Sequence, residues 1–364
     1  MKTPAVPKTP KLHWSLRESS HRLIESLAPT IQIALGATAA YLIARYGLGH
    51  AIPLLAVTAC ISSLGFSRDA RPRRIAATAA GMVTGIALSE TMLIFLGEGI
   101  WQLTAVLLLV LLAARFLTSN AAFAIAAGTQ SMLVYLLPAP PGGPYMRSID
   151  GLIGGLTALV VTALIPRDPR GLAKSDATKL FDVFLDSVSL LRHALTRSDI
   201  RAADATLLQV RKTQPLVDNW RMSLDSAIAI ARISPFLRKY RDELSGQLRL
   251  MRGMDLATRN LRVIVRRIDF LLRDGEPRPY LADLMDQIEA AVRTLRAALD
   301  EPELRDRSQE ELVQIIHQLD PKRFGIADQL REASVLLLLR PMLVDLLCAA
   351  GMSEEDARAE LPAI

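Results

Sequence analysis

Residues 103–117 read LTAVLLLVLLAARFL, and residues 151–165 read GLIGGLTALVVTALI. A helix at the surface of a soluble domain carries polar residues at regular steps, which gives it one polar face. Neither stretch has such a face, so each predicts a helix that is apolar on every side. Several helices of this kind in one chain indicate an integral membrane protein rather than a soluble one.

Further apolar runs flank these two stretches, and a helix that spans a bilayer needs about 20 mainly apolar residues. The sequence contains six such runs, at about 30–47, 52–66, 75–96, 101–117, 120–137 and 149–165. We therefore expect an all-α fold in which a six-helix transmembrane domain covers residues 29–166.

The composition changes at the end of the last apolar run. From residue 167 onward charges of both signs are dense and apolar residues keep a helical spacing, which predicts a cytoplasmic helical domain over residues 167–364. Charged residues and a proline interrupt its most apolar part, residues 335–351, so we expect a buried bundle helix there, with a seventh span as the alternative. Residues 1–28 predict a cytoplasmic tail and an amphipathic helix on the inner membrane face, or simply a lead-in to the first span.

Positive charge gathers in alternate gaps between the apolar runs, and cytoplasmic loops are enriched in Lys and Arg. The densest cluster is SRDARPRR (67–74), whose arginines are Arg68, Arg71, Arg73 and Arg74. We interpret it as an inner-face anchor, which places both termini in the cytoplasm. A nucleic-acid site is the alternative, but a gap between two membrane spans does not favour it.

The composition gives no sign of an enzyme or of a secreted fold. Lys and Arg number 43 against 37 Asp and Glu, and the net charge of +6 does not require an acidic macromolecular partner. The two cysteines, Cys60 and Cys348, lie in different halves and suggest no disulfide framework. HxxxH, CxxC, GxSxG and Walker-type motifs are absent from the sequence, so we predict no catalytic residue, no metal site, no cofactor and no nucleic-acid partner.

The apolar half contains a weak internal repeat. LIARYGLGHAIPLLAV (42–57) is similar to LAARFLTSNAAFAIAA (112–127), and RRIAATAAGMVTG (73–85) is similar to RSIDGLIGGLTAL (147–159). Each unit of the repeat holds three predicted spans, so the second unit would enter the membrane in the inverted orientation. Inverted repeats of this kind are a transporter architecture.

Glycines recur at four-residue steps in the third and sixth predicted spans. They are Gly81, Gly85, Gly151 and Gly155. Small residues allow helix backbones to approach closely, so we interpret these glycines as helix-packing positions rather than as substrate contacts.

Polar residues within the apolar half are candidates for a transport pathway, because ionisable groups at membrane depth are costly and usually functional. The predicted pathway residues are Arg45, Glu90, Arg115, Asn120 and Gln130. The alternatives are an interface anchor for each arginine, a solvated carboxylate for Glu90, and interhelical hydrogen bonds for the two amides. Asp150, which opens the sixth span, is expected to act as a cap at the outer face.

The six spans, the arginine-rich loop before RRIAATAAGMVTG, the ARY and ARF pair and the helical second half together resemble the fusaric-acid-resistance-like family. That family includes bacterial aromatic acid exporters, and the resemblance is best over residues 30–170. It implies a secondary transporter of the inner membrane that exports small organic anions, is driven by the proton gradient and works as a homo-oligomer, a dimer or larger. A passive anion channel on the same scaffold and a non-transporting membrane scaffold protein are the alternatives.

Overall fold

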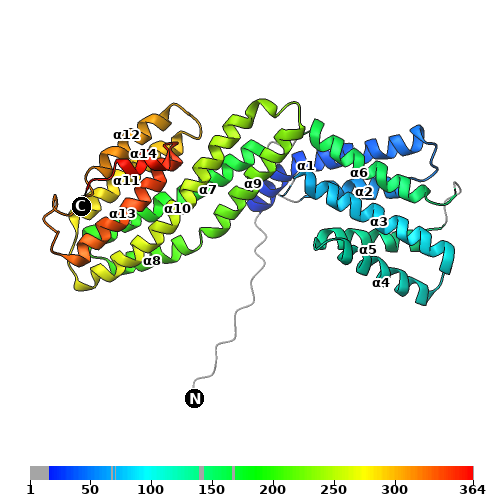
Figure 1. Ribbon diagram of the computed structural model, residues 1–364, viewed down its shortest axis with the longest axis horizontal. Coiled ribbons are helices and arrows are strands. Elements are labelled where there is room, and N and C mark those ends of the chain that lie inside the picture. The colour runs from blue at the N-terminus through cyan, green and yellow to red at the C-terminus, as the bar shows by residue number, and fades with distance from the viewer. Residues whose placement is uncertain (1–15, 67–68, 70, 139–142, 166–168, 364) are drawn as a thin grey trace, which may run out of the picture. The chain divides into compact units, whose positions relative to one another are not determined.

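The computed structural model describes residues 16–66, 69, 71–138, 143–165 and 169–363, and these residues form helices and loops without a β-strand. Arg68 lies outside the described residues, as does the predicted tail up to residue 15. The contacts divide the chain into two compact units, residues 1–167 (unit 1) and residues 168–364 (unit 2). Both units are bundles of helices (Figure 1).

The described part of unit 1 contains α1 (Leu16–Leu42), α2 (Leu54–Leu64), α3 (Pro72–Leu96), α4 (Ile100–Leu117), α5 (Ala121–Leu136) and α6 (Met146–Leu164). A π-helical turn, Ile43–Gly47, extends α1 at its C-terminal end. The amphipathic helix and the first span, predicted as separate segments, form one helix that continues through Pro29.

Four segments in the described part of the chain are long and apolar enough to cross a membrane: Ser26–Gly47, Pro72–Leu96, Ile100–Leu117 and Met146–Leu164. The other two predicted spans are the shorter helices α2 and α5. Pro53 precedes α2 and Gly65, with a φ of 50°, ends it, so its 11 residues reach about 16 Å. That length is about half of a typical hydrocarbon core. The structure therefore supports an apolar, membrane-type unit without establishing six full spans.

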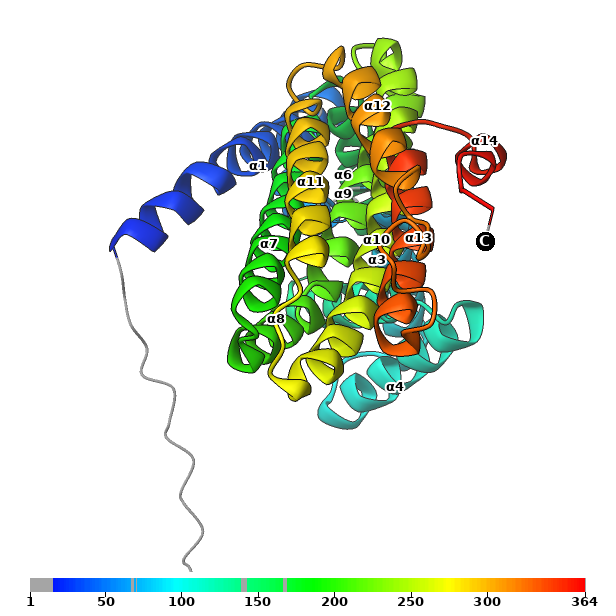
Figure 2. The same ribbon diagram turned by 90° about the vertical axis from the view of Figure 1, so that its left-hand side faces the viewer.

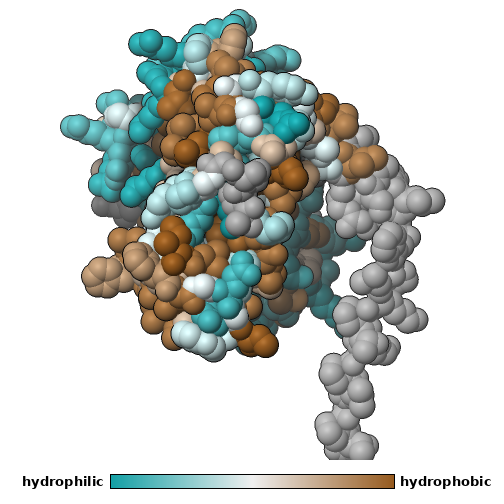
Figure 3. Space-filling model, turned by 90° about the vertical axis from the view of Figure 1, so that its right-hand side faces the viewer, coloured by the Kyte–Doolittle hydropathy of each residue, from teal (hydrophilic) through white to brown (hydrophobic). Residues whose placement is uncertain are grey.

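The outward faces of unit 1 are apolar, as expected for helices that contact lipid. Phe116 is 92% exposed and Ile100 is 90% exposed. Figure 3 shows apolar residues over much of the face that it presents. A soluble monomer rarely exposes so many large apolar side chains together.

Most helix pairs of unit 1 have a counterpart when its two halves are exchanged, although α2 packs on α3 and α5 makes no comparable contact with α6. α3 packs on α5 and α6 packs on α2, while α3 and α6 also pack on each other. In the same way α1 packs on α2 and α4 packs on α5, and α1 contacts α6 as α4 contacts α3. A repeat of three helices, with the third helix of each half packed against the second helix of the other, would produce this pattern.

Glycines lie at the closest of these helix crossings. A Cβ atom added to Gly81 would lie 2.6 Å from the carbonyl oxygen of Phe123 in α5, and one added to Gly85 would lie 2.7 Å from the Cα atom of Ala127. Glycines in α6 pack on α3, where a Cβ atom on Gly151 would meet Ile86 and one on Gly155 would meet Ala79, each at 2.6 Å. Gly154, between them, lies against the backbone of Ala56 in α2.

The described part of unit 2 contains α7 (Pro169–Arg197), α8 (Ile200–Arg211), α9 (Gln214–Ile233), α10 (Arg241–Leu271), α11 (Pro279–Ala297), α12 (Leu304–Ile316), α13 (Leu330–Ala349) and α14 (Glu354–Ala359). α7 packs on α9 and α11, and α10 packs on α13. α10, α11, α12 and α13 run alongside one another in Figure 2.

The core of unit 2 contains aromatic residues from α7 and α9, including the fully buried Phe181, Phe184 and Trp220. The rings of Phe181 and Trp220 lie 6.4 Å apart. α13 includes most of the apolar stretch that raised the question of a seventh span. Its residues Leu336, Leu339, Leu343 and Leu347 are fully buried. It does not meet the length and composition measure for a membrane span.

Asp345 in α13 gives unit 2 a testable pH dependence. Burial raises the pKa of its carboxyl from 3.8 to about 6, although Asn260 Nδ2 donates a hydrogen bond to Oδ2 at 2.6 Å. A raised native pKa means that this group contributes stability below about pH 4, which is lost as the pH rises through about 6. We expect Asp345→Asn to raise the free energy of unfolding at about pH 7 by roughly 1–2 kcal/mol, after allowance for solvent screening.

The same substitution should have little effect near pH 4, where the native carboxyl is already protonated. The measurement is the thermal unfolding midpoint of the full chain in detergent as a function of pH. Asp283→Asn, at an exposed position on α11, is the matched control. Equal midpoints for Asp345→Asn and the wild type at neutral pH would contradict the assignment.

Candidate functional site

A cavity of about 290 Å³ lies at the end of unit 1 where α2 and α6 begin and α5 ends. Most of its wall is apolar, and three of its residues are ionisable. The lining residues are His50, Ala51, Ile52, Leu54, Leu55, Leu137, Pro138, Met146, Arg147 and Asp150. The connections after α1, α3 and α5 meet at this end, where Tyr135 at the end of α5 accepts from and donates to the backbone of Gly99.

His50 and Asp150 form a buried pair on the cavity wall. His50 Nδ1 lies 2.6 Å from Asp150 Oδ1, and the two residues are 6% and 4% exposed. His50 is held in turn by Arg45, whose Nη1 donates to the carbonyl oxygens of His50 at 3.2 Å and of Ala51 at 2.5 Å. The predicted pathway residue Arg45 therefore positions the segment that carries His50.

Glu90 of α3 lies at the N-terminus of α6. Its carboxylate accepts hydrogen bonds from the backbone amides of Arg147 at 3.3 Å and Ser148 at 3.2 Å, and from Ser148 Oγ at 2.6 Å. The first amides of a helix have no partner within the helix, and a negative charge there is favoured by the helix dipole. Glu90 thus serves as an interhelical cap that joins α3 to the first turn of α6.

Arg147 makes the corresponding contacts at the end of α5. Its guanidinium donates to the carbonyl oxygens of Val134 at 2.9 Å, Leu137 at 2.7 Å and Pro138 at 2.5 Å. The residue is 8% exposed. These acceptors are neutral, and among the described residues no carboxylate contacts the guanidinium directly, so the positive charge beside the cavity is not neutralised by such a contact.

An arginine occupies a similar place in the first half of unit 1. Arg74, in the first turn of α3, donates from Nη2 to the carbonyl oxygen of Leu64 at the end of α2, at 3.3 Å, and from Nε to the carbonyl oxygen of Asp69. Hydrogen bonds from Arg71 hold the pKa of Asp69 below its ordinary value. Arg71 and Arg73 are exposed. The members of the predicted anchor cluster that are described therefore include two exposed arginines and one that ties α3 to α2.

The other predicted pathway residues lie away from the cavity lining. Gln130 is 1% exposed in the middle of α5, with Nε2 3.5 Å from Thr58 Oγ1 and from Met82 Sδ, while its Oε1 has no partner in the described part of the chain. Asn120 caps α5 by accepting a hydrogen bond from the amide of Ala122. Arg115 is exposed and donates to the carbonyl oxygen of Ser119 at 2.8 Å.

Three ionisable residues of the cavity, His50, Arg147 and Asp150, are not among the predicted pathway residues. His50 and Asp150 are 100 positions apart; His50 falls in a short connection and Asp150 opens the sixth predicted span, and the sequence alone places both at a solvated edge. One signal was available for Arg147, because the internal repeat aligns it with Arg73, beside the capping Arg74. In the alignment of the two repeat units, the capping arginines Arg74 and Arg147 are therefore offset by one residue.

Comparisons with known proteins agree with the resemblance seen in the sequence. Residues 37–161 match the family model described as fusaric acid resistance protein-like. The chain is also 26% identical to an uncharacterized protein of Corynebacterium glutamicum, over 98% of this chain and 93% of that protein. The family match covers all of α2 to α5 and most of α6, which includes the cavity and its polar residues. Residues 37–161 of unit 1 are thus similar to the fusaric acid resistance protein-like family, and this similarity suggests a membrane transporter.

Proposed function

We propose that this protein is a secondary transporter that exports small organic anions, aromatic carboxylates in particular, and that the cavity beside Arg147 is where the anion binds. The observation that carries the proposal is the combination of apolar walls with a buried guanidinium. Apolar side chains such as Leu54, Leu55 and Leu137 favour a ring. The Arg147 guanidinium already donates to three backbone carbonyls, and it offers a carboxylate its positive charge and its remaining donors.

The His50–Asp150 pair supports a proton-coupled mechanism rather than a passive channel. A hydrogen-bonded histidine and carboxylate on the wall of the same cavity can hold or release one proton, so that anion binding and proton binding affect each other. A passive channel needs the positive charge of Arg147 but has no need of this pair. We further propose that the protein lies in the inner membrane with both termini cytoplasmic and assembles as a homo-oligomer, in line with its family.

Transport measurements in proteoliposomes test the anion site. Arg147→Lys keeps the positive charge and loses the planar fork, and we expect it to raise the half-saturating concentration of an aromatic carboxylate about tenfold, equivalent to about 1.4 kcal/mol. Arg45→Gln and Arg115→Gln are measured beside it, because their place in the pathway is still a prediction. An unchanged half-saturating concentration in a correctly folded Arg147→Lys protein would remove the cavity from the pathway.

The same vesicles test the coupling pair. We expect His50→Gln and Asp150→Asn each to abolish the stimulation of flux by an imposed pH gradient while anion exchange without a gradient continues. His317→Gln is the matched control, since His317 Nε2 lies 2.7 Å from Glu360 Oε2 in an exposed pair of unit 2. If an imposed pH gradient does not change the wild-type flux, the result favours a passive anion channel. If the wild-type flux is no greater than that of empty vesicles, it favours a non-transporting scaffold protein.

A further inference from the structure

α10 presents a regular stripe of exposed residues along one face. Exposed positions recur at alternating steps of three and four residues, and the last of them lies in the 3₁₀ turn Leu272–Asp274 that follows the helix. The members of this stripe are Arg249, Arg252, Leu256, Arg259, Val263, Arg266, Phe270 and Arg273. At 1.5 Å per residue the stripe is about 36 Å long.

The stripe combines large apolar side chains with positive charge. Leu256, Val263 and Phe270 are 48%, 50% and 47% exposed. The guanidinium carbons of Arg267, Arg273 and Arg331 lie 5.7, 6.0 and 5.7 Å from the centre of the Phe270 ring. Between Arg249 and Arg273 the exposed members of the stripe include no acidic residue, although the same register continues towards the N-terminus of α10 to the exposed Ser245 and Asp242. This surface therefore attracts a partner that is both negatively charged and able to accept apolar groups.

Acidic residues of the same helix compensate only part of the positive charge on the stripe. Arg259 and Arg273 are bonded to Asp255 and Asp269, which lie beneath them, yet their side chains remain 55% and 65% exposed. The other three arginines, Arg249, Arg252 and Arg266, have no hydrogen-bond or ion-pair partner among the described residues. Three unpaired arginines on one face of one helix leave a strong local excess of positive charge.

The spacing alone would also suit a partner helix, but the residue types argue against one. In a coiled coil every one of these positions would enter the seam between the helices. Alternate positions would then bury Arg252, Arg259, Arg266 and Arg273, and the desolvation of successive guanidinium groups is expensive. A second copy of the same stripe would add repulsion between like charges.

We propose that this stripe docks on the anionic headgroups of the bilayer in which unit 1 resides. At a membrane surface the guanidinium groups reach lipid phosphates, while leucine, valine and phenylalanine enter the boundary between headgroups and acyl chains. In contrast to a helix–helix interface, this arrangement does not remove the guanidinium groups from water and phosphate. The chain itself keeps unit 2 close to the bilayer, because α6 ends at Leu164 and α7 begins at Pro169.

Lipid quenching of a fluorophore tests the proposal in the full chain. A cysteine introduced by Val263→Cys is labelled with nitrobenzoxadiazole, a fluorophore whose emission depends on its environment. The native Cys348 is replaced by serine so that it does not react, and Cys60 is fully buried and is retained. The protein is placed in nanodiscs of phosphatidylcholine with or without phosphatidylglycerol, and spin-labelled lipids serve as quenchers. We expect a blue shift and quenching only with phosphatidylglycerol, both reversed by high salt. A label at Asp283→Cys, exposed on α11, should show neither.

Charge reversal separates the stripe from the net charge of the protein. Arg252→Glu with Arg266→Glu should abolish the quenching at position 263, since each arginine near an anionic surface is worth about a fivefold change in the ratio of docked to undocked molecules. Arg201→Glu with Arg323→Glu changes the net charge equally at exposed positions outside the stripe and should preserve the quenching.

Two outcomes would overturn the proposal. Equal quenching in pure phosphatidylcholine would mean that the anionic headgroup is not what the stripe binds. A blue shift at position 263 without quenching by lipid would place a protein surface over the stripe, either another copy or another partner.

Discussion

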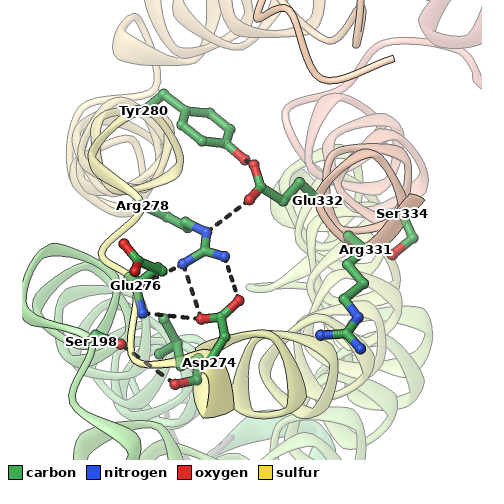
Figure 4. A network of polar contacts seen from close by, with 9 residues as sticks. Ser198, Asp274, Glu276, Arg278, Tyr280, Arg331, Glu332 and Ser334 are labelled. Atoms are coloured by element: carbon green, nitrogen blue, oxygen red, sulfur yellow. Dashed lines mark hydrogen bonds and ion pairs between the residues drawn. The ribbon is translucent and has the colours of Figure 1, made fainter. Parts of the chain in front are cut away.

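Arg278→Met should lower the free energy of unfolding of unit 2 by about 2–4 kcal/mol, because it removes the buried cation of an ionic network and leaves the half-buried Glu332 and the exposed Asp274 uncompensated. Arg278 is 7% exposed. Its Nε donates to Glu332 Oε1 at 2.9 Å, and its Nη1 and Nη2 donate to Asp274 at 3.2 and 2.7 Å (Figure 4). A third acceptor is the carbonyl oxygen of Glu276.

The network joins helices that are distant in the sequence, which is why its loss should affect the whole unit. Arg278 precedes α11, Asp274 follows α10 and Glu332 lies in the first turn of α13. The amide of Arg278 also donates to the carbonyl oxygen of Leu195 in α7 at 2.8 Å. Burial, and then the hydrogen bond to Glu332, raises the pKa of Tyr280, so its hydroxyl stays a neutral donor to that carboxylate.

Thermal unfolding of the full chain in detergent measures the effect, and a loss of this size corresponds to a fall on the order of 10 °C in the midpoint. Arg358→Met is the matched control, since Arg358 pairs with Glu354 at 2.5 Å and both side chains are exposed, by 68% and 67%. Exposed pairs of this type contribute about 0.3–0.5 kcal/mol. Arg278→Lys, which keeps the charge and loses the fork, should fall between the two. If Arg278→Met and Arg358→Met shift the midpoint equally, the network does not stabilise the unit.

The class of the fold was predictable because it depends on hydropathy, which is a local property of the chain. Stretches such as 103–117 are apolar on every side, and the helix α4 was predicted from them within about a residue. The helix α5, predicted at about 120–137, was placed equally closely, since it runs from Ala121 to Leu136. The helix α2 is two residues shorter at each end than the predicted run 52–66, because the backbone at Pro53 and Gly65 sets where it begins and stops while the apolar sequence continues.

The candidate site was only partly predictable, because its polar residues interact across long sequence separations. Glu90 was identified as a costly group at membrane depth, but its partners at the start of α6 could not be known from its neighbours in sequence. His50 is a lone histidine between two apolar runs, and only folding brings it to Asp150. Ionisable residues at the ends of spans are as often anchors as pathway groups, and the sequence does not separate the two.

The glycines of α3 were identified from the four-residue spacing of small residues, and the structure shows why Gly85 is the most sensitive of them. Its added Cβ atom would meet the backbone of Ala127, with the Cα atom at 2.7 Å and the carbonyl oxygen closer still. A side-chain neighbour can change rotamer, but a helix backbone moves only with the helix. α3 would have to separate from α5, the helix with which it makes its most extensive contact in unit 1.

Gly85→Ala should therefore destabilise unit 1 strongly, at or above the upper end of the roughly 1–3 kcal/mol that overpacking usually costs. Gly47→Ala is the same chemical change at a site where the added Cβ atom meets nothing within 4 Å, and it should be neutral. Gly155→Ala should be intermediate, because the atom it meets is the methyl group of Ala79 rather than a carbonyl oxygen. The measurement is the fraction of monodisperse protein extracted in detergent, together with its thermal midpoint. Wild-type values for Gly85→Ala would show that α3 and α5 can separate without cost, and the close crossing would not be what holds unit 1 together.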